Sequence, residues 1–225
     1  MTAQAQETSR GPAGKRPLRR DAVRNRQRIL AAASQVFTER GLDATLDEVA
    51  RAAGVGIGTV YRRFPDKESL VAALFRERVD NLVTVAEDAC AAADPWQGIV
   101  SYLEYAAAAM AGDTGLRQLM MFATYDRDQV CYARDRMRPV ISRLVERAQA
   151  SGDLREDFAA TDVKMIAFML ASLAEYAAAV TPDVWRRYLA MLIDGLRPSR
   201  GEVSRLPVPA PSAQQLGELM RGQRR

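Results

Sequence analysis

Apolar residues recur every three to four positions along most of this chain of 225 residues, which is the period of an amphipathic α-helix. The first such run predicts a helix from about Asp21 to Arg40, which ends at Gly41. Its apolar face is made of Ile29, Leu30, Ala33, Val36 and Phe37. No segment alternates with the period of two that marks a half-buried strand, so we expect an all-α protein.

Two short helices around a glycine turn are predicted next. Thr45 and Glu48 have the spacing of a capping box, in which each side chain satisfies a backbone N–H at the start of a helix. Gly54 is expected to end this helix, because glycine readily adopts the left-handed conformation of a helix terminus. The second helix should run from about Gly56 to Phe64 and stop at Pro65, which pushes the preceding residue out of helical geometry.

A third helix is expected to begin after a capping Asp66 and to run to about Ala92. Two short helices joined by a tight turn form a helix-turn-helix, a shape that can place its second helix in the major groove of DNA. With Val60 and Phe64 buried, the outer surface of the second helix is left to Ile57, Gly58, Thr59, Tyr61, Arg62 and Arg63. An ordinary three-helix core, in which Tyr61 merely packs, is the alternative interpretation.

The remainder also has helical periodicity. Further helices are predicted at about 94–110, 114–125, 127–150, 161–177 and 182–194. Pro139 lies inside one of them and predicts a kink or a break there. The last two are apolar on more than one face and rich in small residues: Ala167, Ala171, Ala174, Ala177 and Ala178. A helix of this kind must be buried on both sides, either within its own domain or against a second subunit in a four-helix interface.

Charge is distributed unevenly along the chain. Residues 1–70 hold 13 Lys and Arg against 8 Asp and Glu, a balance of +5, whereas residues 71–196 hold 13 against 18, a balance of −5. The tail at 197–225 has a balance of +4. The positive N-terminal part coincides with the helix-turn-helix, as binding to phosphates requires. Its basic side chains before the first helix, which could lie along a minor groove or belong to an inert tail, are Lys15, Arg16, Arg19 and Arg20.

Several classes of protein are disfavoured. No apolar stretch reaches the roughly 20 residues of a membrane span, and the N-terminus lacks the apolar region of a secretory signal. Cys90 and Cys131 are far apart without a pairing pattern, so we expect a reduced, cytoplasmic protein. The chain has no histidine, the commonest general base and metal ligand, and it has no Walker loop or nucleophile elbow. Neither an enzyme nor a metal or other cofactor is expected.

The stretch Ala-Gly-Val-Gly-Ile-Gly-Thr-Val-Tyr-Arg-Arg-Phe-Pro-Asp-Lys-Glu-Ser-Leu at 53–70 resembles the helix-turn-helix of the TetR family of transcriptional regulators. The resemblance covers roughly 22–75, and the rest of the chain fits the larger domain of that family in length and order. It implies a homodimer that binds a near-palindromic operator, most often as a repressor, and an inducing ligand bound by the C-terminal domain.

By position, the resemblance also implies two kinds of DNA contact. The side chains expected to hold phosphates are Thr45, Thr59, Tyr61 and Lys67. The residues expected to face base edges are Ile57, Gly58 and Arg62. Arg63 stands where many relatives have histidine, also near the DNA backbone. Gly56 replaces the capping serine or threonine of many relatives, a loss of only a few tenths of a kcal/mol.

An effector pocket in the C-terminal half would need side chains that are large, adaptable or tipped with a polar group. The candidates are Trp96, Tyr102, Tyr105, Met121, Phe122, Tyr125, Phe168 and Tyr176. For each of them, an ordinary core position is the alternative interpretation and the one that the residue type by itself favours. Such a pocket would be mostly apolar, so we expect a small lipophilic or aromatic effector.

The sequence therefore predicts four parts: a disordered basic arm at 1–20, a helix-turn-helix DNA-binding domain at 21–67, a larger helical ligand-binding and dimerisation domain at 68–196, and a flexible tail at 197–225. The expected function is that of a ligand-responsive, sequence-specific DNA-binding regulator. A DNA-binding architectural protein that needs no ligand is the alternative, and it would show only a shallow sequence preference. A protein-interaction module with a decayed DNA surface is disfavoured by the intact 53–70 stretch.

Overall fold

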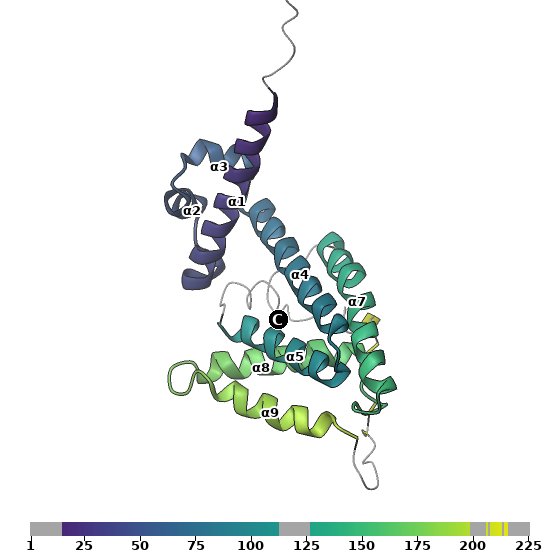
Figure 1. Ribbon diagram of the computed structural model, residues 1–225. Helices are drawn as coiled ribbons and strands as arrows, with labels where there is room; N and C mark the ends of the chain where they lie inside the picture. Colours follow the sequence, from purple (N-terminus) through teal and green to yellow (C-terminus); the bar gives the residue numbers. More distant parts are fainter. Residues whose placement is uncertain (1–14, 113–126, 199–205, 207, 213, 216–225) are drawn as a thin grey trace, which may run out of the picture.

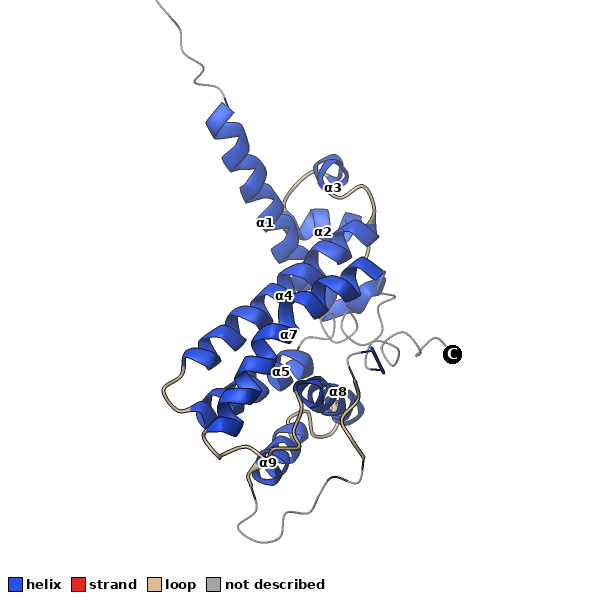
Figure 2. Cartoon of the chain, turned by 90° about the vertical axis from the view of Figure 1, so that its right-hand side faces the viewer, coloured by secondary structure: helices blue, strands red, loops and turns tan. Residues whose placement is uncertain are grey.

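The computed structural model describes residues 15–112, 127–198, 206, 208–212 and 214–215 (Figure 1). Every regular element in these residues is a helix, as the sequence predicts. Figures 1 and 2 show α1, α2 and α3 grouped at one end, α5, α7, α8 and α9 at the other, and α4 between the two groups. The helix expected at 114–125, with the candidates Met121, Phe122 and Tyr125, lies outside the described residues.

The N-terminal group consists of α1 (Lys15–Arg40), a 3₁₀ turn η1 (Gly41–Asp43), α2 (Leu46–Ala53) and α3 (Ile57–Arg63). α1 begins earlier than the expected Asp21, so residues 15–20, expected to be disordered, are helical. Pro17 lies in the first turn of α1, where a proline removes no intrahelical hydrogen bond, so it does not prevent the helix from starting there.

The predicted helix boundaries around the turn are confirmed. The Thr45 hydroxyl accepts from the Glu48 N–H at 3.3 Å, and the Glu48 carboxylate accepts from the Thr45 N–H at 2.8 Å, which completes the capping box of α2. Gly54 ends α2 with φ 62° and ψ 38°, in the left-handed region. Asp66 caps α4 by accepting from the Ser69 N–H at 2.7 Å.

The C-terminal group consists of α5 (Pro95–Gly112), α7 (Arg127–Ala150), α8 (Ala160–Ala177) and α9 (Val184–Leu196). α4 (Lys67–Ala91) runs from the N-terminal group into this bundle, where it packs along α7 and α5 (Figure 1). α5 in turn packs on α8, and α8 on α9. The bundle is therefore built around two central helices, α5 and α8.

Pro139 does not break α7, so the alternative of a break at this position is wrong. The proline is exposed, whereas Val140, Ile141 and Leu144 directly after it are at most 5% exposed. Burial of these side chains in the bundle offsets the hydrogen bond that a proline removes from a helix interior.

The described residues form two apolar cores, and α4 contributes to both. Leu70 and Leu74 pack in the core of α1, α2 and α3, whereas Phe75, Val79 and the residues after them pack in the bundle. We call α1 to α3 with residues 67–74 the small domain, and residues 75–198 the large domain. The first two turns of α4 thus complete the smaller core.

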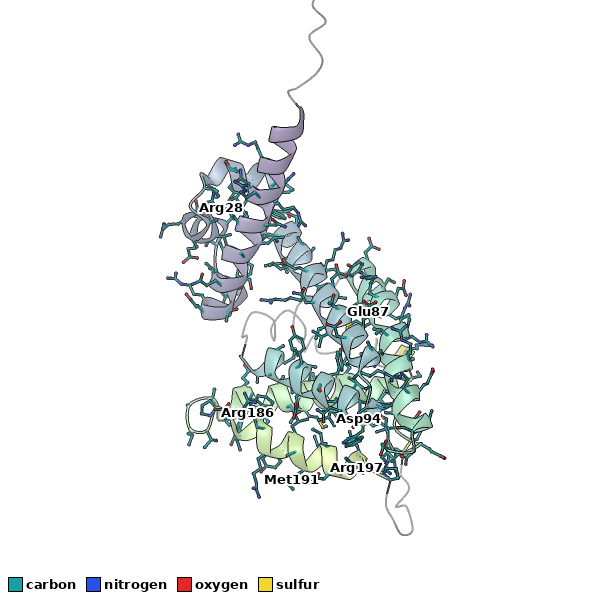
Figure 3. The ribbon with its side chains drawn as sticks, viewed as in Figure 1. Arg28, Glu87, Asp94, Arg186, Met191 and Arg197 are labelled. Carbon is teal, nitrogen blue, oxygen red and sulfur yellow. The ribbon has the colours of Figure 1, made fainter. Side chains whose placement is uncertain are left out.

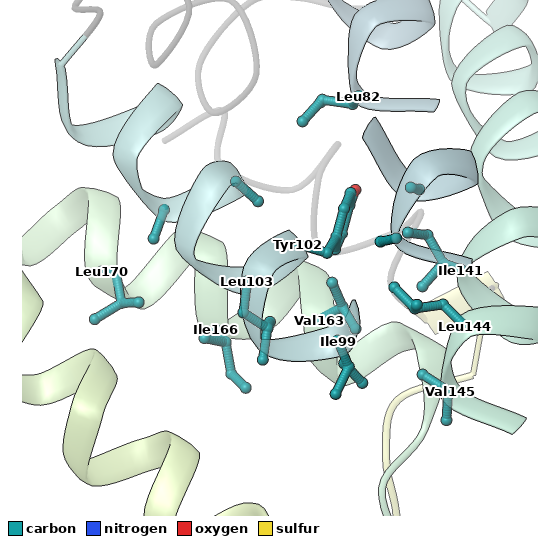
Figure 4. Close-up of a cluster of buried hydrophobic side chains, with 14 of the residues drawn as sticks. Leu82, Ile99, Tyr102, Leu103, Ile141, Leu144, Val145, Val163, Ile166 and Leu170 are labelled. Atoms are coloured by element: carbon teal, nitrogen blue, oxygen red, sulfur yellow. The ribbon is translucent and has the colours of Figure 1, made fainter. Parts of the chain in front are cut away.

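The large core surrounds Tyr102, which is 1% exposed (Figure 4). Figure 4 shows its ring among Leu103, Val163 and Ile141, which come from α5, α8 and α7. Among the described helices, none is long and apolar enough to cross a membrane. Within the same residues no group of acidic or sulfur-bearing side chains could hold a metal ion, and both cysteines are free thiols.

Candidate DNA-binding interface

α3 is buried on one side and open on the other. Val60 is 0% exposed and Phe64, the residue that ends the helix, is 4% exposed, as predicted. The residues expected at base edges or phosphates are exposed or half-buried on the remaining surface: Ile57, Gly58, Thr59, Tyr61, Arg62 and Arg63. Tyr61 is 49% exposed, so the interpretation in which it merely packs in a core does not describe this chain.

Arg62 is held against its own helix. Its guanidinium donates to the Thr59 hydroxyl at 3.0 Å, one turn earlier on α3. This bond limits the rotamers of a long, exposed side chain before any DNA is present, which lowers the entropy lost when the side chain is ordered at a base or a phosphate. Thr59 and Arg62 are therefore best regarded as one polar unit on the surface of α3.

Two glycines in and beside α3 have no packing role. A Cβ added at Gly56 or at Gly58 would meet nothing within 4 Å. Glycine inside a helix is less favourable than alanine by roughly 1 kcal/mol, and nothing in the described chain requires it at Gly58. A surface without side chains here lets another molecule approach the backbone of α3 closely.

Two candidate phosphate-binding residues, Thr45 and Lys67, lie at the starts of helices. The Thr45 hydroxyl accepts from the Glu48 N–H and donates to the Glu48 carboxylate at 3.0 Å. Hydrogen bonds from Thr45, with a smaller contribution from Arg40, hold the pKa of Glu48 below its usual value. A phosphate would therefore compete with an ionised carboxylate for the Thr45 hydroxyl. Lys67, the first residue of α4, is half-buried.

Arg28 is a contributor that sequence reasoning missed. Its guanidinium donates to the carbonyl oxygens of Ala53 at 2.8 Å and Gly54 at 3.5 Å, so it ties the middle of α1 to the end of α2 (Figure 3). Carbonyls at a helix C-terminus lack intrahelical partners and favour a cation. Arg28 thereby fixes the turn that leads into α3. No local sequence signal marks it, because the contact spans 25 residues.

Exposed arginines surround this arrangement. Those with described side chains in the small domain are Arg24, Arg26, Arg28, Arg40, Arg51, Arg62 and Arg63. The Arg26 guanidinium also lies over the Phe64 ring, 5.9 Å from its centroid. The side chains of Lys15, Arg16, Arg19 and Arg20 lie outside the described part, so a minor-groove arm stays a prediction.

The candidate pocket residues are not gathered into one place. Trp96 and Tyr102 lie in the large core, and burial raises the pKa of Tyr102. The Arg197 guanidinium covers the Trp96 ring at 4.3 Å. Phe168 is half-buried, whereas Tyr105 and Tyr176 are 41% and 91% exposed. In a single chain Tyr176 therefore lies on the surface.

The large domain also carries exposed apolar side chains on α8, on α9 and between them. They are Met169, Tyr176, Val180, Tyr188 and Met191, with exposed fractions from 46% to 91%. Figure 3 shows Met191 on the side of α9 that faces away from the bundle. Of the small residues expected at a second interface, Ala171 and Ala174 are instead buried within the domain. We call these five apolar residues the interface surface, and in the described part of the chain they remain exposed.

Comparison with known proteins also indicates a helix-turn-helix regulator. A family model for bacterial regulatory proteins of the tetR family matches residues 29–74, and one for the C-terminal domain of SbtR-like transcriptional regulators matches residues 94–198. The TetR transcription regulatory protein from Mycobacterium vanbaalenii is 32% identical, with a TM-score of 0.63 over 81% of this chain and 100% of that one. This chain belongs to the TetR family of transcriptional regulators.

The helix-turn-helix of this TetR-family chain is thus a DNA-binding one. The HTH-type transcriptional regulator SAB2452 of Staphylococcus aureus is 35% identical over 68 residues, which are 30% of this chain and only 37% of that protein. FadR from Bacillus subtilis, in complex with stearoyl-CoA, is 17% identical, with a TM-score of 0.58 over 76% of this chain and 99% of that one. That likeness shows the shared fold alone.

Proposed function

We propose that this TetR-family regulator works in the cytoplasm as a homodimer that represses transcription from an imperfectly palindromic operator, and that a small lipophilic or aromatic effector releases it. The observation that carries the proposal is the outer surface of α3. Its exposed Tyr61 and Arg62 flank a backbone left open at Gly58, while Val60 anchors the opposite side in the core.

On this proposal, the residues of α3 and Lys67 at the start of α4 have different roles in recognition. Thr59, Tyr61 and Lys67 bind phosphates and fix the register, which carries no sequence information by itself. Arg62 reads a base edge, in the geometry that suits a bidentate pair with guanine O6 and N7. Gly58 lets the helix enter the groove deeply enough for Arg62 to reach.

Homodimer formation is supported by the interface surface on α8 and α9. Five exposed apolar side chains in one region are costly in water, and a patch of this kind marks an interaction site. A two-fold dimer uses the same patch on both subunits, so one surface is sufficient. Two copies of α3 would then meet major grooves one helical turn or a multiple of it apart.

Effector control is supported more weakly, by the fold that the large domain shares with FadR, which binds stearoyl-CoA. A ligand of the large domain changes the DNA affinity only to the extent that it binds one spacing of the two α3 helices better than the other.

The test is selection of randomised duplex oligonucleotides by the purified full chain, together with sedimentation of the free and the DNA-bound protein. We expect a dimer that selects two half-sites related by a dyad, with affinity at least a thousandfold above that for random DNA. A shallow preference would support the ligand-independent architectural protein instead. A monomer that selects no site would contradict the proposal.

A further inference from the structure

Two charged residues, Arg187 and Asp194, lie on the outer side of α9. The buried side chains of this helix, each at most 8% exposed, are Trp185, Leu189 and Leu196. At about 100° per residue, Arg187, Met191 and Asp194 lie within about 60° of one another on the opposite side, and all three are exposed. Figure 3 shows Met191 on the side of α9 that faces away from the bundle. The two charges therefore flank Met191, which belongs to the interface surface.

Neither charge is compensated within the described part of the chain. Arg187 and Asp194 are two helical turns apart, about 10 Å along the axis, and neither side chain makes a hydrogen bond or an ion pair with a described residue. The adjacent Arg186, in contrast, donates to Asp183 at 3.2 Å and covers the Trp185 ring at 4.4 Å. The outer side of α9 thus carries an unpaired cation near its start and an unpaired anion near its end.

The order of these two charges is unfavourable for α9 by itself. The macrodipole of a helix favours anions near the N-terminus and cations near the C-terminus. α9 has the reverse arrangement, with Arg187 close to Val184 at its start and Asp194 close to Leu196 at its end. The electrostatics of the isolated helix therefore do not account for these residue types in this order.

A second copy of α9 that runs antiparallel compensates both charges at once. Arg187 and Asp194 are equally far from the midpoint between Ala190 and Met191. A two-fold axis through that midpoint places Arg187 opposite the partner's Asp194, and the symmetry repeats the contact. Each arginine then also lies near the C-terminal end of the partner's helix, where the macrodipole favours a cation. Ala190 is small and exposed, so it lets the two helices approach closely.

We propose that α9 packs antiparallel on α9 of a second copy of this chain, with the crossing at Ala190 and Met191, and that each Arg187 forms an ion pair with the partner's Asp194. This assignment rests on the proposed homodimer and adds its register and the residues that select the partner. Met191 and Tyr188 supply apolar contact, and the charges lie at its edge, as in interfaces with an apolar centre and a polar rim. A parallel arrangement would bring like charges together, which disfavours it.

The test exchanges the two charges in the full-length protein and measures dimer affinity by sedimentation velocity over a concentration series. Arg187→Asp places two anions at each contact and Asp194→Arg places two cations there, so each variant should dimerise more weakly than the wild type by about tenfold or more. A double variant with both substitutions restores opposite charges and should dimerise within about threefold of the wild type. Both positions are exposed, so circular dichroism should show the wild-type helix content in every variant.

An equal mixture of the two single variants separates a direct ion pair from a general loss of affinity. In a mixed dimer one chain supplies both anions and the other both cations, so both contacts are complementary. The mixed dimer should form with an affinity within about threefold of the wild type, although neither variant pairs well with itself. The differences should shrink at about 1 M NaCl, because salt screens exposed charges. The control is Arg143→Asp, the same change at an exposed position of α7, which should dimerise like the wild type.

A cross-link detects the contact itself. Arg187→Lys keeps the cation and introduces an amine, which a water-soluble carbodiimide joins to a carboxylate in contact with it. In a mixture of ¹⁴N- and ¹⁵N-labelled chains, mass spectrometry should find position 187 of one chain joined by an amide bond to the partner's Asp194. Arg143→Lys should give no link to Asp194.

Two results would overturn the assignment: single variants that dimerise like the wild type, or a mixed pair that is no tighter than either variant alone. If either result comes with a dimeric wild type, the homodimer stands and only the position of the contact is wrong. A wild type that stays monomeric would overturn the homodimer and the assignment together.

Discussion

The small and the large domain differ in the kind of side chain that each exposes to solvent. The small domain seals its apolar side chains in one core and exposes arginines together with an open backbone on α3. The large domain exposes apolar side chains on α8 and α9, and it buries an unpaired hydroxyl at Thr161. The exposed arginines of the small domain suit a polyanion, whereas the exposed apolar side chains of the large domain suit a second subunit.

α4 connects these two regions, and polar contacts fix it to each. Arg78 of α4 donates to the Ser34 hydroxyl of α1 in the small domain. Asp80, half a turn later, accepts from the Tyr132 hydroxyl at 2.8 Å and from the Arg136 guanidinium at 3.1 Å, both on α7. Burial, followed by the bond to Asp80, raises the pKa of Tyr132. A displacement of α7 would therefore be transmitted to α4 and from there to the small domain.

The largest expected effect comes from closing the open backbone of α3. Gly58→Leu adds a side chain that meets nothing in the chain, so the fold should keep its melting temperature. On a duplex the same side chain would occupy the space of a base edge. Operator affinity should fall more than a hundredfold, or about 3 kcal/mol, in fluorescence anisotropy. Gly112→Leu, also in open space, is the control, and equal affinity of both variants would show that α3 does not approach DNA closely.

The matching change in the large domain is Met191→Asp, which puts a charge into the interface surface, where Met191 is 58% exposed. A buried, unpaired carboxylate at an interface should weaken the dimer by about 2 kcal/mol or more, which is roughly thirtyfold in the dissociation constant. Sedimentation velocity over a concentration series measures this. The variant should remain folded as a monomer. Dimers of unchanged affinity would place the interface on another surface, and Arg143→Asp on α7 serves as the control.

A smaller effect is expected from Arg62→Ala. Loss of a bidentate base contact should cost about 1–3 kcal/mol and relax one position of each half-site. Thr59→Val removes the hydroxyl that holds Arg62 and should reproduce part of this loss without relaxing the position fully. Selection from randomised duplexes distinguishes the cases. Weakening by the same factor at every sequence, with a flatter salt dependence, would show that Arg62 contacts only phosphate.

The two domains also differ in how much the sequence reveals. Thr45, Gly54 and Asp66 act on backbone groups within a few residues, so the helix boundaries of the small domain could be predicted and are confirmed. The bond from Arg28 to Ala53 joins groups 25 residues apart, and no local pattern encodes such a contact.

In the large domain, even fewer of the tertiary contacts can be predicted from the sequence. Tyr102 and Tyr176 look alike in sequence, yet one is 1% and the other 91% exposed, because tertiary packing decides which side of a doubly apolar helix is covered. The lack of a hydrogen-bond partner for the buried Thr161 hydroxyl is likewise a result of packing. Which candidate residues line a pocket therefore cannot be predicted from the sequence alone, because it depends on how the helices of the bundle pack.

The smallest effect concerns the loop between α7 and α8. The Arg155 guanidinium, helped by the Leu206 N–H, lowers the pKa of Asp157 from 3.8 to about 2. Because the folded-state pKa is lowered, the ionised carboxylate stabilises the fold above pH 3.8, and this stabilisation is lost as the pH falls to about 2. The Asp157 side chain is 37% exposed, so solvent screening keeps the contribution below about 1 kcal/mol.

Asp157→Asn keeps the size of the side chain and removes this charge. Urea unfolding at pH 7 should show a loss below about 1 kcal/mol, and the difference from the wild type should shrink at pH 3 and vanish near pH 2. A difference of equal size at pH 7 and pH 3 would mean that the loop depends on the shape of the carboxylate and not on its charge. Asp183→Asn is the control, since it removes a carboxylate that is 77% exposed in its pair with Arg186. DNA affinity at pH 7 should be unchanged in both variants, because this loop is tied to the end of α9 and to Leu206, whereas the Arg28 bond that fixes the turn before α3 lies within the small domain.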